Sequence, residues 1–351
     1  MTAMRGPSHL VSGFLDGSLP LPDQDEVDAR LTELDRQLVR LLQADGRRSF
    51  AGMARELDVP EKTVRRKVNQ LLDDNVIQIT AVADPALLGF PVMALVGLAF
   101  DGGQAVKPLM NSLAELPAVD YAVITTGRYD ALVEVLCRDT AELLTVVHDT
   151  LARTPGVGSA EVFPYLQLHY QEPAWDVAQD KAAPERTEEG EGAQAASLDA
   201  TDRQIIGELS LDGRLPFQGI AETVGISESQ VRKRVTRMIG DRVLRITAIA
   251  NPRSLGFGMQ VWVAIRCRPG QGVEALAQLL TKIPSITYVV ACAGRFDIFA
   301  EAVCRDAQDV MRLIDSEIRT LPGVERTELL MCLDLYYRAV RPAERRTGDG
   351  A

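Results

Sequence analysis

The feature that most constrains the fold of this chain is a long internal repeat. The segment GRYDALVEVLCRDT begins at Gly127, and GRFDIFAEAVCRDA begins at Gly294, which is 167 residues later, with seven of fourteen positions identical. The same offset aligns residues 35–170 with residues 202–337 without an insertion. Solenoid repeats have periods of about 20–50 residues, so two long copies indicate a tandem duplication of one folded unit.

The composition indicates a soluble globular protein. The chain has 351 residues, of which 46% are hydrophobic and 25% charged, and this length allows two or three domains. Its five cysteines show no metal-ligand spacing, which favours free thiols in a reducing compartment and no metal site. No apolar run reaches the roughly 20 residues of a membrane span, and the N-terminus lacks an apolar signal core. We therefore expect a cytoplasmic protein that does not contact a membrane.

The net charge of −11 is unevenly distributed along the chain. Residues 171–197 hold seven acidic and two basic residues and are rich in Ala, Gly and Glu, without apolar periodicity. Such a composition is typical of a flexible, solvated linker. Because nearly half of the excess negative charge lies there, the acidic total does not exclude binding of nucleic acid.

The first part of each unit has the pattern of a helix-turn-helix. Leucines recur at helix spacing over residues 31–42, and Gly46 ends this run. Ser49 can cap a second, short helix, and the helix that follows is apolar on one face and basic on the other. The second unit repeats this order, with Gly225 at the turn and Ser227 as a helix cap. A short helix, a tight turn and a helix with a basic outer face predict a winged-type helix-turn-helix.

The basic residues of the last helix in each motif predict binding to double-stranded DNA. Arg and Lys read guanine edges in the major groove and Gln reads adenine, while flanking cations contact phosphates. A solvated basic helix face is the alternative, but two copies behind a matching helix and turn favour DNA binding. The predicted DNA-binding residues are Lys62, Thr63, Arg65, Arg66, Lys67, Ser227, Ser229, Gln230, Arg232, Lys233, Arg234 and Arg237.

The two motifs are not equivalent in sequence. Where the second has Gly225 and Ser227, the first has Asp58 and Pro60. Aspartate is less favourable than glycine in a left-handed turn, and proline cannot cap a helix with its side chain. We therefore expect the first motif to be less well formed or to differ in sequence preference.

The second part of each unit alternates strands and helices. In the first unit the order is strand, helix, two strands joined through residues 127–129, helix and closing strand. This βαββαβ order predicts a ferredoxin-like domain, in which two helices cover one face of a four-stranded antiparallel sheet. The overall class is α+β, and the other sheet face of each unit is left open to a partner.

The Gly-Arg-aromatic-Asp turn admits a structural and a functional interpretation. Gly with a positive φ and a capping Asp would explain a hairpin without any ligand. Strand alternation, however, puts a mid-strand glutamate on the same face as the aspartate, and such a glutamate needs a polar partner. An amino acid would suit, since backbone N–H groups can bind its carboxylate and the aspartate its ammonium. The candidate effector-binding residues are Gly127, Arg128, Tyr129, Asp130, Glu134, Gly294, Arg295, Phe296, Asp297 and Glu301.

Together these segments resemble the Lrp/AsnC (feast/famine) family of transcription regulators. The resemblance covers residues 30–170 and 197–340 and is carried by LDRQLVRLLQADGRRSFAGMARELDV, TTGRYDALVEV and TPGV, with second copies TDRQIIGELSLDGRL, CAGRFDIFAEA and LPGV. It implies amino-acid-responsive control of transcription, a strand that links each helix-turn-helix to its sensor, and dimers that stack into larger rings. It also implies an effector near the Gly-x-x-Asp turn. We expect no cofactor.

The chain departs from the ordinary family member because it is a tandem fusion of two units. We expect the two units of one chain to pair as a covalent version of the family's dimer, within a homo-oligomer. The predicted domains are a disordered tail (1–27), a first helix-turn-helix domain (28–82), a first sensor (83–170), a flexible acidic linker (171–197), a second helix-turn-helix domain (198–249), a second sensor (250–340) and a C-terminal tail (341–351).

Two other functions remain open on the sequence. Siroheme decarboxylase is similar in fold and also occurs as paired units, but its pattern has histidine and aromatic residues leading into this turn. The approaches here, YAVITTGRYD and YVVACAGRFD, contain no histidine, and no phosphate loop or nucleophile–base pair is present, so we expect no enzymatic activity. A sensor that regulates a protein partner without contacting DNA is the third interpretation.

Overall fold

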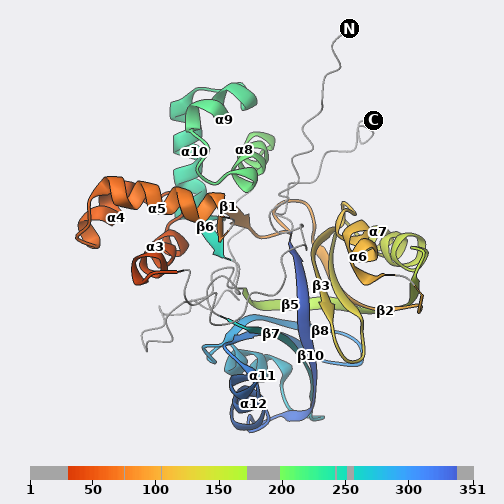
Figure 1. The fold of residues 1–351 in the computed structure, drawn as a ribbon. Coiled ribbons are helices and arrows are strands. Elements are labelled where there is room, and N and C mark those ends of the chain that lie inside the picture. The colour runs from red at the N-terminus through yellow and green to blue at the C-terminus, as the bar shows by residue number, and fades with distance from the viewer. Residues whose placement is uncertain are drawn as a thin grey trace, which may run out of the picture.

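The fold places two helical domains on one side of the molecule and two sheets with their covering helices on the other (Figure 1). The computed structural model describes residues 31–74, 76–103, 105–171, 198–241, 243–250 and 257–337. The predicted tails and all but the first residue of the predicted linker lie outside these ranges.

Each helical domain consists of three helices, as the apolar periodicity predicts. Thr32 and Asp199 open the two domains with capping boxes, and Ser49 caps the second helix of the first domain. The predicted helix-turn-helix motifs are therefore confirmed. The first domain contains α3 (Glu33–Ala44), α4 (Phe50–Glu56) and α5 (Glu61–Asp73), and the second contains α8 (Ala200–Leu211), α9 (Phe217–Val224) and α10 (Glu228–Gly240).

A strand follows each helix-turn-helix and leads toward the sensor. These strands, β1 (Ile77–Ala83) and β6 (Leu244–Ala250), pair with each other in antiparallel register, with Thr80 opposite Thr247. A wing would require two paired strands within one unit. Here each unit supplies one strand, and the two strands form a sheet between the units. The apolar side chains of β1 and β6, such as Ile79, pack in a single hydrophobic core together with those of both helical domains.

The two sensors have the predicted βαββαβ order. In both, the second helix continues into a wider, π-type turn, η1 (Val146–Leu151) and η3 (Leu313–Ile318). The first sensor contains β2 (Val92–Phe100), α6 (Val106–Ala114), β3 (Val119–Thr125), β4 (Ala131–Cys137), α7 (Thr140–Thr145) and β5 (Val157–Gln171). The second contains β7 (Met259–Cys267), α11 (Val273–Leu280), β8 (Ile286–Cys292), β9 (Ile298–Cys304), α12 (Ala307–Arg312) and β10 (Val324–Tyr337).

The two four-stranded sheets do not stay separate, because their long last strands cross from one unit to the other. β5 pairs first with β2 and then with β8, while β10 pairs first with β7 and then with β3. The eight strands close into one barrel in the order β10-β3-β4-β2-β5-β8-β9-β7. Closure satisfies the edge strands that each isolated sheet would leave unpaired.

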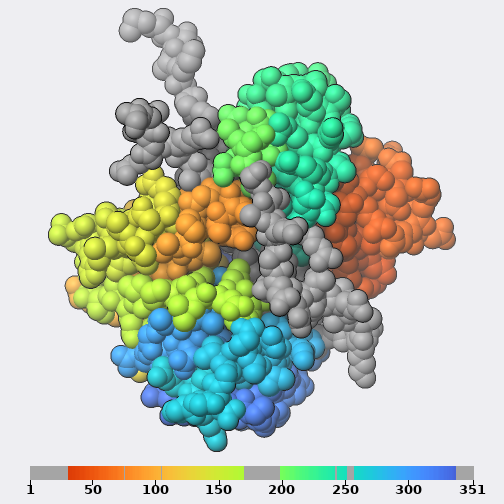
Figure 2. All heavy atoms as spheres, turned by 180° about the vertical axis from the view of Figure 1, so that it is seen from behind, coloured from red at the N-terminus to blue at the C-terminus, as the bar shows by residue number. Residues whose placement is uncertain are grey.

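The sheet face that the sequence leaves open in each unit is covered by the sheet of the other unit. The interior cluster of the barrel combines residues of both units, with Phe163 beside Phe296 and Phe299 and Trp262 beside Tyr288. The helices of each sensor cover the outer faces and enclose a separate core for each unit. Seen from behind, the first sensor (orange to yellow-green) lies directly against the second (blue), and the helical domains lie at the upper right (Figure 2). The two units therefore pair within one chain, as expected of a covalent dimer.

Candidate functional site

The last helix of each helix-turn-helix, α5 or α10, is called the recognition helix here. Each recognition helix buries one face and exposes the opposite one. Val64 and Val68 of α5 are buried in the shared helical core, as are Val231 and Val235 at the corresponding positions of α10. Because side chains three and four positions apart lie on one helix face, these valines direct the residues between them outward.

Three of the predicted DNA-binding cations are available on these outer faces. Lys62, Arg66 and Lys233 are exposed, and they form no ion pair or hydrogen bond within the described ranges. Thr63 is half-buried, and Ser229 is exposed with its hydroxyl 3.0 Å from that of Ser227. These side chains can reach base edges or phosphates without breaking an ion pair.

Three other predicted cations instead connect the recognition helix to the first helix of its domain. Lys67 Nζ lies 3.0 Å from the carboxylate of Asp35. In the second unit, Arg234 and Arg237 contact the carboxylate of Asp202 at 2.9 Å and 2.6 Å. Both aspartates are almost fully buried and therefore need these cations as partners. We leave these three cations out of the proposed DNA interface, since their role here is to position the helix.

Arg65 and Arg232 have weaker attachments. Each forms an ion pair with the glutamate one turn earlier in its helix, at 3.0 Å and 2.7 Å. Each guanidinium also lies over an aromatic ring, that of Phe50 for the first unit and that of Phe217 for the second. Exposed pairs of this kind contribute little stability, so both arginines can turn toward a phosphate.

The predicted difference between the two motifs is present. Asp58 adopts a left-handed φ of 52°, and Gly225 occupies the same place with φ 76°. Pro60 makes no capping hydrogen bond, whereas Ser227 forms a full capping box with Gln230. The amide oxygen of Gln230 accepts the hydrogen bond of the Ser227 N–H at 3.0 Å, so only its Nε2 group remains to contact a base.

Reciprocal contacts hold the two helical domains together. The hydroxyl of Thr80 donates to the carbonyl of Ser210, and that of Thr247 donates to the carbonyl of Gln43, both at 2.8 Å. All four residues are buried. β1 and β6 thus each contact the first helix of the other domain. Local sequence patterns did not reveal this relation.

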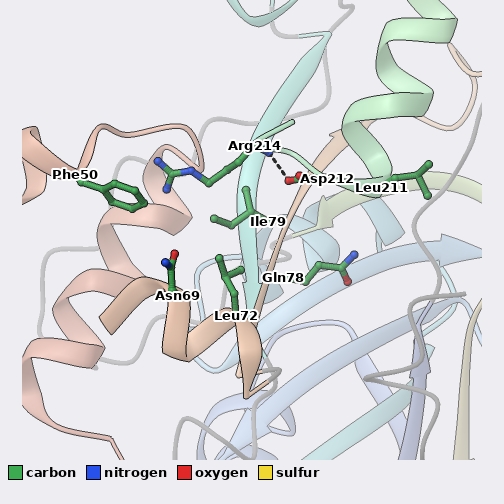
Figure 3. A pocket seen from close by; sticks show the side chains of 8 residues that line it. All are labelled: Phe50, Asn69, Leu72, Gln78, Ile79, Leu211, Asp212 and Arg214. Atoms are coloured by element: carbon green, nitrogen blue, oxygen red, sulfur yellow. Dashed lines mark hydrogen bonds between the residues drawn. The ribbon is translucent and has the colours of Figure 1, made fainter. Parts of the chain in front are cut away.

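An exchange of arginines strengthens this joint. Arg47 lies 4.2 Å from the ring centroid of Phe217, and Arg214 lies 4.5 Å from that of Phe50. Figure 3 shows the side chain of Arg214 directed toward Phe50. Both residues line a cleft of 380 Å³ between α5, β1 and the end of α8. Both pairs are related by the repeat offset, which is the signal that could have found them.

The two effector turns have the same frame. Gly127 and Gly294 adopt φ of 104° and 139°, which favour glycine. Asp130 accepts a hydrogen bond from the Phe100 N–H, and Asp297 accepts one from the Cys267 N–H, both at 2.7 Å. The expected role of the glycines is confirmed, whereas each aspartate braces the neighbouring strand instead of capping the hairpin.

The arginine of each turn contacts the other unit. Arg128 donates to both carboxylate oxygens of Glu328, at 2.8 Å and 3.1 Å. Arg295 donates to Glu161 at 2.9 Å, and Glu161 also accepts a 2.7 Å hydrogen bond from the Tyr129 hydroxyl. Sequence reasoning missed both glutamates, although they too are related by the repeat offset.

One arginine makes the two turns chemically different. Arg266 Nη1 of β7 lies 3.1 Å from the carboxylate of Asp297 and 3.2 Å from the carbonyl oxygen of Gly294. At the corresponding place in the first unit stands Ala99, and Asp130 forms no ion pair within the described residues. The second turn therefore already contains a cation where the first has none.

The mid-strand glutamates face the interior of the barrel. Glu134 accepts hydrogen bonds from the hydroxyls of Tyr165 at 2.9 Å and Tyr288 at 3.2 Å. Glu301 accepts one from the hydroxyl of Tyr121 at 2.8 Å. Tyr288 and Tyr121 each belong to the other unit, so the two glutamates join the units reciprocally. Because the protein itself supplies their polar partners, we leave both out of the proposed effector site.

Burial dominates the electrostatics of these glutamates. It raises the pKa of Glu134 to about 7, against the opposing effect of the hydrogen bonds from Tyr165 and Tyr288. Burial also raises the pKa of Asp120, which the neighbouring Glu134 charge raises further. The second unit has Thr287 in place of Asp120, and its hydroxyl donates to Glu301 at 3.0 Å.

Two exposed recognition helices on one joined base, with a two-unit sensor barrel attached, define a DNA-binding regulatory protein. Comparison with known proteins gives its family. An AsnC-type helix-turn-helix domain matches residues 31–72 and 198–239, and an Lrp/AsnC ligand binding domain matches residues 93–175 and 260–341. The chain belongs to the Lrp/AsnC family of transcriptional regulators and carries two copies of each of its domains.

Individual relatives match one unit at a time. An uncharacterized HTH-type transcriptional regulator of Pyrococcus abyssi is 36% identical over 133 residues, which are 38% of this chain and 84% of the relative. The HTH-type transcriptional regulator FL11 of the same organism is 31% identical over 141 residues, which are 40% of this chain and 92% of the relative.

A solved structure matches the arrangement of both units. The siroheme decarboxylase NirDL superposes with a TM-score of 0.58 over 88% of this chain and 94% of its own, at 16% identity. A likeness at this identity shows the shared fold alone. In the described part of the chain, no helix is long and apolar enough to cross a membrane.

Proposed function

We propose that this regulator binds double-stranded DNA through the outer faces of α5 and α10, and that an amino acid or related small molecule gates this binding. The observation that carries the DNA assignment is the set of available cations, Lys62, Arg66 and Lys233, on two helices held by one joint. Two such helices can enter successive major grooves on one side of a duplex.

The test is to measure binding to a duplex from upstream of the protein's own gene. Fluorescence anisotropy at two salt concentrations gives the affinity. The double variant Arg66→Ala with Lys233→Ala should lose about tenfold in affinity or more, with a shallower salt dependence. Lys282→Ala, at an exposed cation of the second sensor, is the matched control and should bind like the parent. Equal affinity of the double variant and the parent would contradict this interface.

For the effector we propose the first turn, Gly127–Asp130. None of the backbone N–H groups of residues 127–129 donates a hydrogen bond within the described residues, so they can hold a carboxylate. Asp130 can hold an ammonium, whereas Asp297 is already paired with Arg266. The asymmetry supports one effector per chain.

Isothermal titration calorimetry with each free amino acid in turn tests this site. We expect one equivalent bound per chain, loss of binding in Asp130→Asn, and two equivalents in Arg266→Ala. Asparagine keeps an oxygen for the Phe100 N–H, so Asp130→Asn should leave the turn folded. Two equivalents in the parent protein, or unchanged binding in Asp130→Asn, would count against the first turn.

The homo-oligomer remains part of the proposal. Large apolar side chains are exposed at corresponding places in the two units, with Leu144 61% and Met311 59% exposed on the outer sensor helices. Matched exposed apolar residues are typical of a surface between copies. Light scattering should give a mass above that of one chain, and Leu144→Glu with Met311→Glu should lower it.

A tetrapyrrole enzyme is the second candidate, because NirDL shares the two-unit arrangement. The absence of histidine from both strands that lead into the turns favours the regulator. Incubation with siroheme separates the two: a haem-like absorbance band that decays with product formation would support the enzyme.

A further inference from the structure

The two recognition helices share their central buried valines but differ at several exposed positions. At the three outward positions of the first turns, α5 carries Lys62, Thr63 and Arg66. The corresponding positions of α10 carry Ser229, Gln230 and Lys233. The residues that pack inside, by contrast, are valine at both of the central positions of each helix. These three unlike positions are directed outward, where a bound duplex would lie.

The difference is also one of available charge. On α5, Lys62 and Arg66 are both exposed and without an ion pair among the described residues, whereas α10 has only Lys233 at these positions. Arg66 can donate two hydrogen bonds to the O6 and N7 atoms of a guanine, which a lysine contacts as a point charge. Gln230 offers its Nε2 group, since its oxygen is held in the helix cap.

The joint between the domains makes this difference permanent. In a dimer of identical chains both recognition helices carry the same residues, so they read the same sequence twice. Here the reciprocal contacts of Thr80 and Thr247 and the pairing of β1 with β6 hold one helix of each kind in every chain. The two helices cannot be exchanged for a matching pair within the chain.

We propose that the operator of this protein is not a palindrome, and that it consists of two unlike half-sites, with guanines beneath α5. This inference rests on the proposed DNA-binding function and adds its specificity. A bound chain then has one orientation on the duplex, so the protein can distinguish the two directions along the DNA.

Selection from a library of random DNA duplexes by the full-length protein, followed by sequencing of the bound fraction, tests the proposal. We expect two half-sites that differ from each other, one of them rich in guanine. Replacing the guanine-rich half-site by a second copy of the other should weaken binding by about tenfold or more.

Exchange variants identify the responsible residues. Lys62→Ser, Thr63→Gln and Arg66→Lys together give α5 the outer face of α10, and this variant should select a palindrome of the second half-site. Ser229→Lys, Gln230→Thr and Lys233→Arg together should select a palindrome of the guanine-rich half-site. Gln230 also completes the cap of α10, so the second variant should lose some stability, and a single cooperative thermal unfolding transition confirms that each variant folds.

The outcomes separate this inference from the function on which it rests. A palindromic site selected by the parent protein, or a site that neither exchange alters, overturns the proposal and leaves DNA binding intact. If no sequence is enriched, the proposed sequence-specific function fails, and the unlike half-sites fail with it.

Discussion

The first and second units have the same backbone plan, but they differ in a specific set of positions. Several contacts that join the units occur as reciprocal pairs: Arg128 and Arg295 each reach a glutamate of the other unit, and Tyr121 and Tyr288 do the same in the interior. Surface positions at the proposed effector turns do not all match, since Arg266 stands where the first unit has Ala99.

This comparison teaches that symmetry is retained in several polar contacts that join the units and relaxed in part of the interior and at the proposed binding sites. The barrel closes because each unit supplies half of its strands. A single chain, however, can make each recognition helix and each turn different, which a dimer of identical chains cannot. The predictions below test how far the two units are equivalent.

The largest expected effect comes from the interior of the barrel. Phe163 is fully buried and packs on Phe299, with ring centroids 4.8 Å apart, whereas Leu330 takes its place in the other unit. Phe163→Ala should lower the free energy of unfolding by about 3–5 kcal/mol, and Phe163→Leu by clearly less. Urea denaturation measures both. Two separate transitions, only one of them shifted, would show that the units do not fold as one.

Next in size is the pH dependence caused by Glu134. Its pKa is raised to about 7 by burial, so the folded state holds a proton that the unfolded state releases near its ordinary pKa. The contribution of Glu134 to stability is therefore fully present below its ordinary pKa and falls by on the order of 3 kcal/mol as the pH rises toward 8. Asp120, Tyr165, Tyr288 and Glu301 are the titratable groups around it.

The variant Glu134→Gln should flatten this decline, because glutamine keeps hydrogen bonds to the tyrosines but does not ionise. Unfolding curves between pH 5 and pH 8 provide the measurement. Glu325→Gln, at an exposed carboxylate of β10, is the control and should retain the parent slope. A parent slope that persists in Glu134→Gln would show that another group causes it.

A smaller effect is expected at the turns. Tyr129→Phe removes the hydroxyl that donates to Glu161 and should cost about 1 kcal/mol. The reverse change, Phe296→Tyr, places a hydroxyl on the corresponding ring and should recover part of this amount near Glu328. Chemical denaturation of the two single variants and the double variant measures whether the turns become equivalent. Equal losses of stability in Tyr129→Phe and Phe296→Tyr would argue against the expected gain from a hydroxyl beside Glu328.

The smallest effect is expected at the turns of the helix-turn-helix motifs. Asp58 holds a left-handed φ that glycine adopts without strain, so Asp58→Gly should stabilise the protein by up to about 1 kcal/mol. Gly225→Asp should destabilise it by a similar amount, since open space surrounds this position and only the backbone is strained. Thermal unfolding of both variants checks the sign. Stabilisation by Gly225→Asp would contradict the backbone explanation.

Much of the architecture could be predicted from the sequence. Apolar spacing identified the helices, and the repeat offset showed that one unit occurs twice. The capping role of Ser49 and Ser227 and the strained place of Asp58 followed from residue type alone. These features depend on neighbours within a few residues, and such neighbours are visible in a sequence.

The sequence also limited what the candidate sites could contain, but not their connections. It identified the outer faces of α5 and α10 correctly, yet it could not show that Lys67 and Arg234 are held by buried aspartates 32 residues away. It put Glu134 on a definite strand face without showing which side chains cover that face. The partner of a polar group is set by packing between distant segments.

The sequence by itself determined the secondary structure, the duplication and the family. Only the tertiary structure decided that the sheets close into one barrel, that β1 and β6 join the helical domains, and that Arg266 fills one turn but not the other. The physical reason is the sequence separation of the residues in contact. Periodicity and capping involve neighbours along the chain, whereas edge-strand pairing and ion pairs across units depend on how distant segments meet.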